Sequence, residues 1–447
     1  VSTETVTEVQ ATFVAKLTTP QNVTANGTTV SWDAVENATS YDVYADDTVL
    51  LGSVASQSSV DLTTLSGWAT LAPGKHTLQI VARAGNYIDS DKSDPIEFEI
   101  PPDYLCFTAE EAGSTVAMAV EGTPTKGQAF ETSTNRTNWS VFTPGTTTIT
   151  LANAGDKVYF RGNNTTVSES YSIYYNFVMS GKIAASGNIM SLLDTTCKST
   201  TISNNYCYSS MFYGCTSLTT APALPATNLA NDCYSNMFSS CTSLTTAPEL
   251  PATTLADYCY SMMFSDCTSL TTAPALPATN LANDCYNNMF YGCTSLTTAP
   301  ALPATTLAND CYSSMFADCA SLTTASALPA TTLADYCYSN MFAGCTSLTT
   351  APELPATTLA DNCCSNMFYG CTSLTTAPEL PATTLASSCY SYMFFDCSKL
   401  KVNTTSGNKI FTCPTTIPTE AVTDMFTSTG GTFTGTPTEG TTYYYAA

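Results

Sequence analysis

Residues 233–258, CYSNMFSSCTSLTTAPELPATTLADY, form a 26-residue unit that recurs along the C-terminal half of the chain. Cys, Met, Phe, Leu and the Leu-Pro-Ala step recur in nearly every copy, whereas variation gathers at a few polar positions. A unit with one apolar edge cannot bury that edge alone, so the pattern predicts a stack of coils with the recurring residues inside. The copies begin at Cys207, Cys233, Cys259, Cys285, Cys311, Cys337, Cys363 and Cys389.

Each coil has two parts. In CYSNMFSSC, at about 100° per residue, the two cysteines, the tyrosine, the methionine and the phenylalanine fall on one arc, which predicts a short amphipathic helix or 3-10 segment. The Thr-rich, proline-interrupted SLTTAPELP predicts a short strand. The expected core ladder contains Cys207, Cys215, Cys233, Cys241, Cys259, Cys267, Met237, Phe238 and Leu218.

The run FYGCTSLT at residues 212–219 resembles the BspA-like leucine-rich repeats of bacterial surface proteins. In those repeats an aromatic residue, a Gly-Cys-like step and a Ser-Leu-Thr strand recur. The resemblance covers about 190 residues and repeats in eight copies. It implies extracellular display with adhesion or ligand binding, and it implies no catalytic activity.

The N-terminal half predicts β-sandwiches. Strand-turn alternation with Trp32, Tyr41 and the run LAPGKHTLQIVARA is similar to a fibronectin type III domain, although His76 lies near the usual corner tyrosine. The expected fold is mainly β and multidomain, with two sandwiches followed by a leucine-rich-repeat solenoid of strand-plus-helix coils. Its predicted parts are a strand-like extension (1–17), a fibronectin-like sandwich (18–101), a second sandwich (102–196), the solenoid (197–401) and a C-terminal cap (402–447).

The charge distribution excludes several partners. The formal net charge is -23, and no Lys, Arg or His occurs between Lys198 and Lys399. Such a surface cannot neutralise phosphates, which argues against nucleic acid and against an anionic membrane surface. No apolar run reaches the roughly 18 residues that membrane insertion requires.

The twenty cysteines allow three interpretations. We favour small buried residues stacked in ladders, with disulfides within or between coils as the main alternative. Zinc is disfavoured, because spacings of eight and eighteen residues build no Cys-x-x-Cys pair and no histidine is near.

A row of tyrosines follows the first cysteine of the coils. It is a candidate binding face on which carbohydrate could stack, although half-buried packing is the more common role of such residues. The row consists of Tyr208, Tyr234, Tyr260, Tyr286, Tyr312, Tyr338 and Tyr390.

No catalytic centre is expected. The acidic residues are scattered over repeated positions rather than paired, which favours a solvated acidic face. His76 is the only histidine, so the solenoid has no Ser-His-Asp or Cys-His centre, and no phosphate-binding loop is present. We therefore predict a non-enzyme that requires no cofactor.

Two functions remain open from the sequence. The first is an extracellular or cell-surface adhesin whose solenoid binds a protein or glycan ligand. The second is a structural subunit of a surface filament or a phage virion appendage, which would assemble with neighbouring subunits through the strand-like residues 1–17 and the Thr-rich tail.

Overall fold

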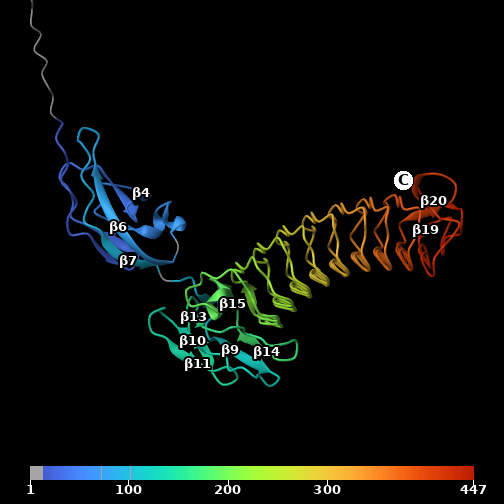
Figure 1. The fold of residues 1–447 in the computed structure, drawn as a ribbon, viewed down its shortest axis with the longest axis horizontal. Coiled ribbons are helices and arrows are strands. Elements are labelled where there is room, and N and C mark those ends of the chain that lie inside the picture. Colours follow the sequence, from blue (N-terminus) through green and yellow to red (C-terminus); the bar gives the residue numbers. More distant parts are fainter. Residues whose placement is uncertain (1–13, 72, 101, 447) are drawn as a thin grey trace, which may run out of the picture. The chain divides into compact units, whose positions relative to one another are not determined.

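The computed structural model divides the chain into two compact units, Val1–Pro102 and Asp103–Ala447 (Figure 1). The structure describes residues 14–71, 73–100 and 102–446. Most of the predicted extension 1–17 therefore lies outside the described residues. Its end is described: the Leu17 amide donates to the Ile88 carbonyl at 2.9 Å, and Lys16 forms a parallel bridge with Ile88.

The first unit contains two antiparallel sheets around one core. Alternating apolar residues of both sheets, among them Val30, Val43 and Ile80, are buried in a single cluster. The assignment of this unit to the fibronectin type III family stays a prediction. The three-stranded sheet has the order β1-β2-β5 (Thr24–Asn26, Thr29–Ser31, Ser59–Asp61), and the four-stranded sheet has the order β4-β3-β6-β7 (Val49–Ala55, Ser40–Ala45, Gly74–Arg83, Ile96–Ile100). Two short 3-10 helices follow β5, η1 (Leu62–Thr64) and η2 (Trp68–Thr70).

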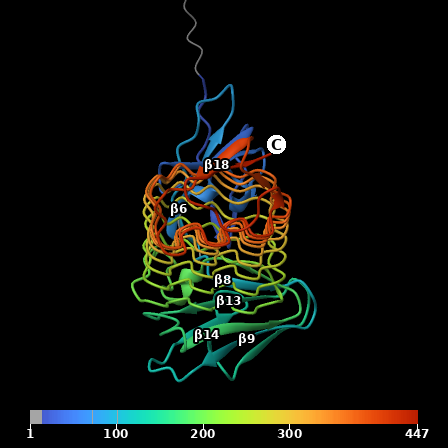
Figure 2. The ribbon, with the colours of Figure 1, turned by 90° about the vertical axis from the view of Figure 1, so that its right-hand side faces the viewer.

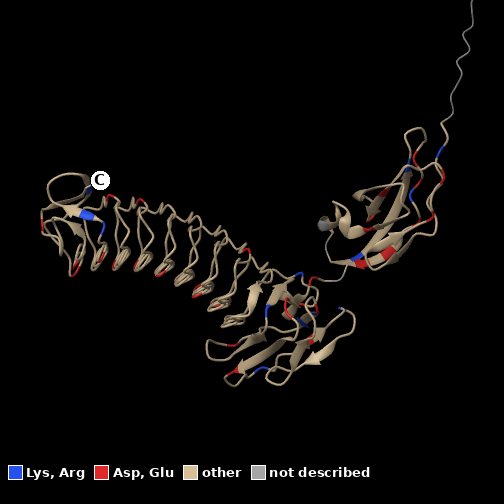
Figure 3. Ribbon diagram, turned by 180° about the vertical axis from the view of Figure 1, so that it is seen from behind, with Lys and Arg blue, Asp and Glu red and all other residues tan. Residues whose placement is uncertain are grey.

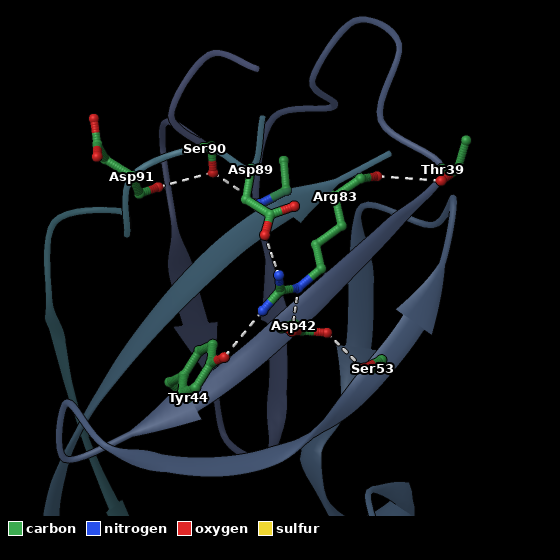
Figure 4. Close-up of polar contacts among 9 residues, drawn as sticks. Thr39, Asp42, Tyr44, Ser53, Arg83, Asp89, Ser90 and Asp91 are labelled. Carbon is green, nitrogen blue, oxygen red and sulfur yellow. Dashed lines mark hydrogen bonds and ion pairs between the residues drawn. The ribbon is translucent and has the colours of Figure 1, made fainter. Parts of the chain in front are cut away.

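Arg83, at the end of β6, ties the second sheet to the loop that follows it (Figure 4). Its guanidinium pairs with the carboxylates of Asp42 and Asp89 and donates to the Tyr44 hydroxyl at 3.3 Å. The hydrogen bond to Asp42 raises the pKa of Arg83 above its ordinary value. Asp42 is almost buried, so its charge needs this partner. The network therefore holds the loop that contains Asp89 against the four-stranded sheet.

The second unit begins with two further sheets, and one of them continues into the repeats. Strand β15 (Ile183–Ser186) pairs in parallel with β16 (Leu218–Thr220), which belongs to the first coil. The sheets have the orders β11-β10-β13-β8-β15-β16 and β12-β9-β14. Their remaining strands are β8 (Leu105–Ala109), β9 (Ser114–Glu121), β10 (Phe130–Ser133), β11 (Ser140–Phe142), β12 (Thr148–Leu151), β13 (Lys157–Gly162) and β14 (Tyr174–Ser180), and the 3-10 helix η3 (Ile189–Leu192) follows β15.

Residues 103–196 therefore cover the N-terminal end of the solenoid. The Phe177 amide of β14 donates to the Met211 carbonyl at 2.8 Å, and the Ile183 amide donates to the Ser217 carbonyl at 3.0 Å. Strands β14 and β15, which belong to different sheets, therefore bond to the first repeat as a preceding coil would. The hydrophobic core runs without a break from these sheets through all the repeats.

The repeats stack as successive coils, which superpose when viewed along the stack (Figure 2). Within each coil the segment from two residues before the first cysteine to the second cysteine forms one side, which we call the turn wall; residues 231–241 are an example. The opposite, extended segment contains Ala-Pro-x-Leu-Pro, residues 247–251 in that coil, and we call it the proline wall. Besides β16, neighbouring extended segments are linked by isolated parallel bridges, such as Thr246 to Thr272, and by single hydrogen bonds, such as that from the Thr323 amide to the Thr297 carbonyl at 3.0 Å.

The predicted helix in each coil is wrong, because the turn wall consists of consecutive overlapping turns. Every fourth residue has a positive φ: Asp232 at 57°, Asn236 at 56° and Ser240 at 60°. The Ser235 amide bonds back to the Asp232 carbonyl at 3.1 Å, whereas the next amide, of Asn236, donates to Ser261 in the following coil at 2.9 Å. Alternate amides thus bond within the coil and between coils, and the backbone is satisfied without a helix.

The turn wall explains why the apolar pattern looked helical. Each group of four begins with two fully buried apolar residues, so Cys233, Met237 and Cys241 are buried at intervals of four residues. Over nine residues this period is close to the helical value of about 3.6. The distinguishing signal is the type of residue at the positive-φ positions, since Asp, Asn and Gly tolerate that conformation best.

A C-terminal cap closes the other end of the solenoid. The cap contains one further turn wall, which has no cysteine and has positive φ at Glu420, Asp424 and Ser428. Its carbonyl groups accept hydrogen bonds from amides of the last repeat. One of these bonds joins the Phe394 amide to the Met425 carbonyl at 3.0 Å. A sheet of the order β18-β20-β17-β19 completes the cap, with strands Asn408–Thr412, Thr442–Tyr445, Lys401–Asn403 and Gly430–Gly431.

Candidate functional site

The tyrosine row that the sequence offered as a binding face lies in the core. Its seven side chains are between 0% and 2% exposed. Neighbouring rings stack in parallel, as between Tyr234 and Tyr260, whose centroids are 5.9 Å apart. These residues occupy an inward position of the turn wall, so a ligand cannot reach them, and the proposed binding role for this row is wrong.

The first and second cysteines of the repeats form two buried ladders of free thiols, and none of the twenty cysteines, all of which are described, is in a disulfide. The second thiol of each repeat donates to a phenylalanine carbonyl of the preceding coil, for example Cys241 to Phe212 at 3.0 Å and Cys267 to Phe238 at 3.1 Å. Burial raises the pKa of Cys215 and of Cys267 to about 12. Neutral buried thiols are poor nucleophiles and poor metal ligands, so the ladders are structural.

The other residues expected in the core ladder lie there as well. Met237, Phe238 and Leu218 have no exposed surface. The phenylalanines form a parallel stack along the whole solenoid, which begins at Phe177 of β14 and ends at Phe426 of the cap.

The exposed aromatic residues of the solenoid lie on the outside of the turn wall. Among the described repeats, the large apolar side chains with substantial exposure are all on this wall. They are Tyr213 (46%), Tyr258 (44%), Met262 (38%), Tyr291 (36%), Tyr336 (44%) and Tyr369 (40%). Sequence reasoning did not single out these residues. The available signal was variation, because several of them occupy the positions where the copies differ.

One of these rows has a regular spacing. Tyr213, Tyr291 and Tyr369 occupy the same position in every third coil. The intervening coils carry Ser239, Ser265, Ala317 and Ala343 at that position. Small side chains neighbour Tyr213 and Tyr291 in the adjoining repeats, which suits contact of their rings with a ligand, whereas Tyr369 stacks on Phe395 of the following coil with ring centroids 5.0 Å apart.

The turn wall is also strongly acidic. No basic residue is present between Lys198 and Lys399, and Figure 3 shows the carboxylates spread along the repeats without any intervening lysine or arginine. Nine of the twelve carboxylates in this stretch lie on the turn wall: Asp232, Asp257, Asp266, Asp284, Asp310, Asp318, Asp335, Asp361 and Asp396. The other three, Glu249, Glu353 and Glu379, lie on the proline wall.

Two of the exposed tyrosines are paired with an aspartate of the next coil. The Tyr258 hydroxyl bonds to the Asp284 carboxylate, and the Tyr291 hydroxyl bonds to Asp318; both interactions raise the pKa of the tyrosine. Burial raises the pKa of Asp284, and repulsion from Asp257 adds to that effect. Each pair presents an aromatic face beside a carboxylate, which is half-buried at Asp284 and exposed at Asp318.

Some of the acidic side chains have a structural role. Asp257 accepts the Asn283 amide at 3.0 Å, and Asp335 accepts the Asp361 amide at the same distance. These bonds link successive coils at the corner where the turn wall begins. Carboxylates of this kind satisfy backbone donors, and they are less available to a ligand.

Shallow apolar hollows run along the proline wall. Three successive hollows have volumes of about 360, 250 and 370 Å³, and each lies between the Ala-Pro-x-Leu-Pro segments of two neighbouring coils. Glu249 borders two of them. This wall is a second surface that a ligand could contact, although it lacks exposed aromatic rings.

The described residues contain no cluster suited to binding a metal ion. Within residues 14–71, 73–100 and 102–446 no group of three or more His, Cys, Asp and Glu side chains is placed to hold a metal ion. His76 lies in the first unit, where its Nδ1 is 2.7 Å from the Asp46 carboxylate. The part of the chain that the structure describes has no helix capable of crossing a membrane.

The fold defines a class of protein, the repeat solenoids that generally act as non-enzymatic scaffolds for interaction. A family model for the BspA type leucine rich repeat region matches residues 191–323 and 310–417, in six copies. These ranges together cover about half of the chain, so the chain belongs to the BspA type leucine-rich-repeat family. The predicted resemblance of the repeats is thereby confirmed. No curated protein and no solved structure matches the chain.

Proposed function

We propose that this protein is a non-catalytic extracellular binding protein, which attaches to a protein or glycan ligand through the surface of its solenoid. Proteins with this type of repeat are typically found at the cell surface or secreted, and they are related to adhesion. The observation that carries the proposal is the row of exposed tyrosines on the turn wall. Aromatic side chains held on a rigid scaffold supply large contact area at a low cost in conformational entropy.

The filament and virion alternative has less support. Both ends of the solenoid are covered within the chain, by strands β14 and β15 and by the cap after Leu400, so coils of neighbouring chains have no open end on which to stack. The assembly hypothesis relied on residues 1–17 and on the Thr-rich tail, and residues 1–13 lie outside the described residues. No observation on the described residues favours a virion protein.

The proposal is tested by applying the labelled full-length chain to arrays of extracellular-matrix proteins and of glycans. We expect saturable binding to a restricted set of array members. The matched control is a chain in which Tyr213, Tyr291 and Tyr369 are replaced by serine, the residue that occupies the same position in two other coils. Uniform silence of the unmodified chain on both arrays would contradict a binding function.

A further inference from the structure

We propose that the turn wall docks a cationic polypeptide segment, whose arginine or lysine side chains lie on the exposed tyrosines beside aspartates of neighbouring coils. The inference rests on the proposed binding function and adds to it the surface and the chemistry of the partner.

The aromatic residues select this wall. The exposed tyrosines project from a backbone that is fixed by hydrogen bonds within and between coils. The proline wall has no comparable rings, and its hollows are shallow. A cation placed over the face of an exposed tyrosine is attracted by the ring, and several such contacts add up to a measurable affinity.

The charge of the wall selects the partner. Residues 199–398 contain twelve carboxylates and no basic side chain, so this region repels nucleic acid and anionic glycans. Mutual repulsion is already visible on the wall, since neighbouring aspartates contribute to raising the pKa of Asp310 after the larger effect of burial. A cationic segment relieves that repulsion, whereas a neutral glycan leaves it in place.

The tyrosine–aspartate pairs fit a guanidinium group particularly well. Asp284 stands beside Tyr258, and Asp318 stands beside Tyr291, each from the following coil. A planar guanidinium can lie over the ring while its edge donates to the adjacent carboxylate. An ammonium group can make only one of these contacts with good geometry, so we expect arginine to bind more tightly than lysine.

The experiment measures the affinity of the full-length chain for a fluorescent nine-residue oligo-arginine. Matched oligo-lysine, oligo-glutamate, cellohexaose and Ca²⁺ are measured as competitors. Three variants carry residues that already occupy the same positions in other coils. They are the aromatic variant (Tyr258→Ser, Tyr291→Ser, Tyr336→Ser), the acidic wall variant (Asp232→Asn, Asp284→Asn, Asp310→Asn) and the control variant (Glu249→Ala, Glu353→Ala, Glu379→Ala).

We expect the aromatic variant, which keeps its charge, to bind oligo-arginine about tenfold more weakly. The acidic wall variant should lose a similar factor, and the control variant, which loses the same charge on the proline wall, should lose less than twofold. Circular dichroism and the thermal midpoint establish that all three variants are folded.

Suppose that the acidic wall variant and the control variant lose the same affinity for oligo-arginine and that the aromatic variant loses none. Binding would then result from the net negative charge alone, and the proposal would be overturned. Competition by cellohexaose or Ca²⁺ but not by oligo-lysine would also overturn it, in favour of a glycan or a divalent cation. If all three variants still bind the ligands found on the arrays, the turn wall is not the binding surface, and this inference fails while the proposed function stands. If the chain binds no array ligand but binds oligo-arginine through the turn wall, the proposed function fails instead.

Discussion

Phe177 of strand β14 stacks on Phe212 of the first coil, with ring centroids 5.3 Å apart and planes 18° from parallel. This pair joins the sheets of residues 103–196 to the repeats through one continuous core. The N-terminal sheets of this unit and the solenoid are therefore expected to unfold as one cooperative structure.

Replacing Phe177 by alanine should destabilise the second unit by roughly 3–5 kcal/mol, because it leaves a cavity between the sheets and the first coil. Denaturant unfolding followed by circular dichroism measures the change. Val178→Thr, at the neighbouring exposed position, is the control and should change the stability by about 0.5 kcal/mol or less. A Phe177→Ala chain as stable as the control would contradict the continuous core.

Gly292 and Asp266 are expected to be energetically coupled. A Cβ atom on Gly292 would overlap Oδ1 of Asp266 in the preceding coil, whereas Gly214, with the same φ of 68°, faces open space. Gly214→Ala should cost only the left-handed backbone penalty of about 1 kcal/mol. Gly292→Ala should cost more.

The excess cost of Gly292→Ala should disappear when Asp266 is replaced by serine, the residue that Ser240 provides at the same position. A double-mutant cycle by urea unfolding measures this coupling. If the effects of the two substitutions on the free energy of unfolding are additive, the close approach of position 292 to Asp266 does not contribute to stability.

Two buried tyrosines of the same row should respond oppositely to the loss of their hydroxyl. Tyr208 donates to the Ile189 carbonyl at 3.1 Å, so Tyr208→Phe should cost about 1 kcal/mol. Within the described part of the chain the Tyr260 hydroxyl is buried without a hydrogen-bond partner. Tyr260→Phe should therefore leave the stability unchanged or increase it, since it removes an uncompensated desolvation cost. Equal destabilisation of both variants in thermal unfolding would contradict this assignment.

The buried thiols predict a loss of stability in alkali. Burial raises the pKa of Cys215, Cys267 and Cys371 from the usual 9.0 to about 12. In the unfolded chain these thiols lose protons near pH 9, while the folded chain retains them. Their contribution is therefore complete below pH 9 and is lost as the pH rises towards 12. Free energies of unfolding at pH 8, 10 and 11 measure the decline.

Cys267→Ala provides the control for the alkaline effect. It removes one titrating group, so the slope of stability against pH should become shallower by up to one proton. Iodoacetamide should also fail to label the ladder thiols of the native chain below pH 9 and should label them after unfolding. Rapid labelling of the native chain would show that the ladders are open to solvent.

A large share of the fold could be predicted from the sequence. Cys233, Met237 and Phe238 recur at fixed positions in the 26-residue unit, and recurrence of apolar residues at a fixed period requires a shared core. The same comparison placed the variable positions outside, where Tyr213 and Tyr291 are exposed. It did not show that these tyrosines form the candidate site.

The sequence of a single coil could not show that the turn wall is not helical, nor that the tyrosine after the first cysteine is buried. Whether Asn236 donates its amide within its own coil or to Ser261 depends on the neighbouring coil, which the local pattern does not describe. A period of four residues and a period of 3.6 differ too little over nine residues to separate the two structures. Tyr234 lies at the edge of the helical arc but at an inward position of the turn wall.

The sequence by itself determined that the chain stacks coils around Cys, Met, Phe and Leu and that the exterior of the repeats carries no cation, because both follow from periodicity and composition. Only the tertiary structure decided which aromatic residues face solvent and which carboxylates stand beside them. The physical reason is that the amide bonds between coils fix the turn wall, and that wall sets the direction of every side chain on it.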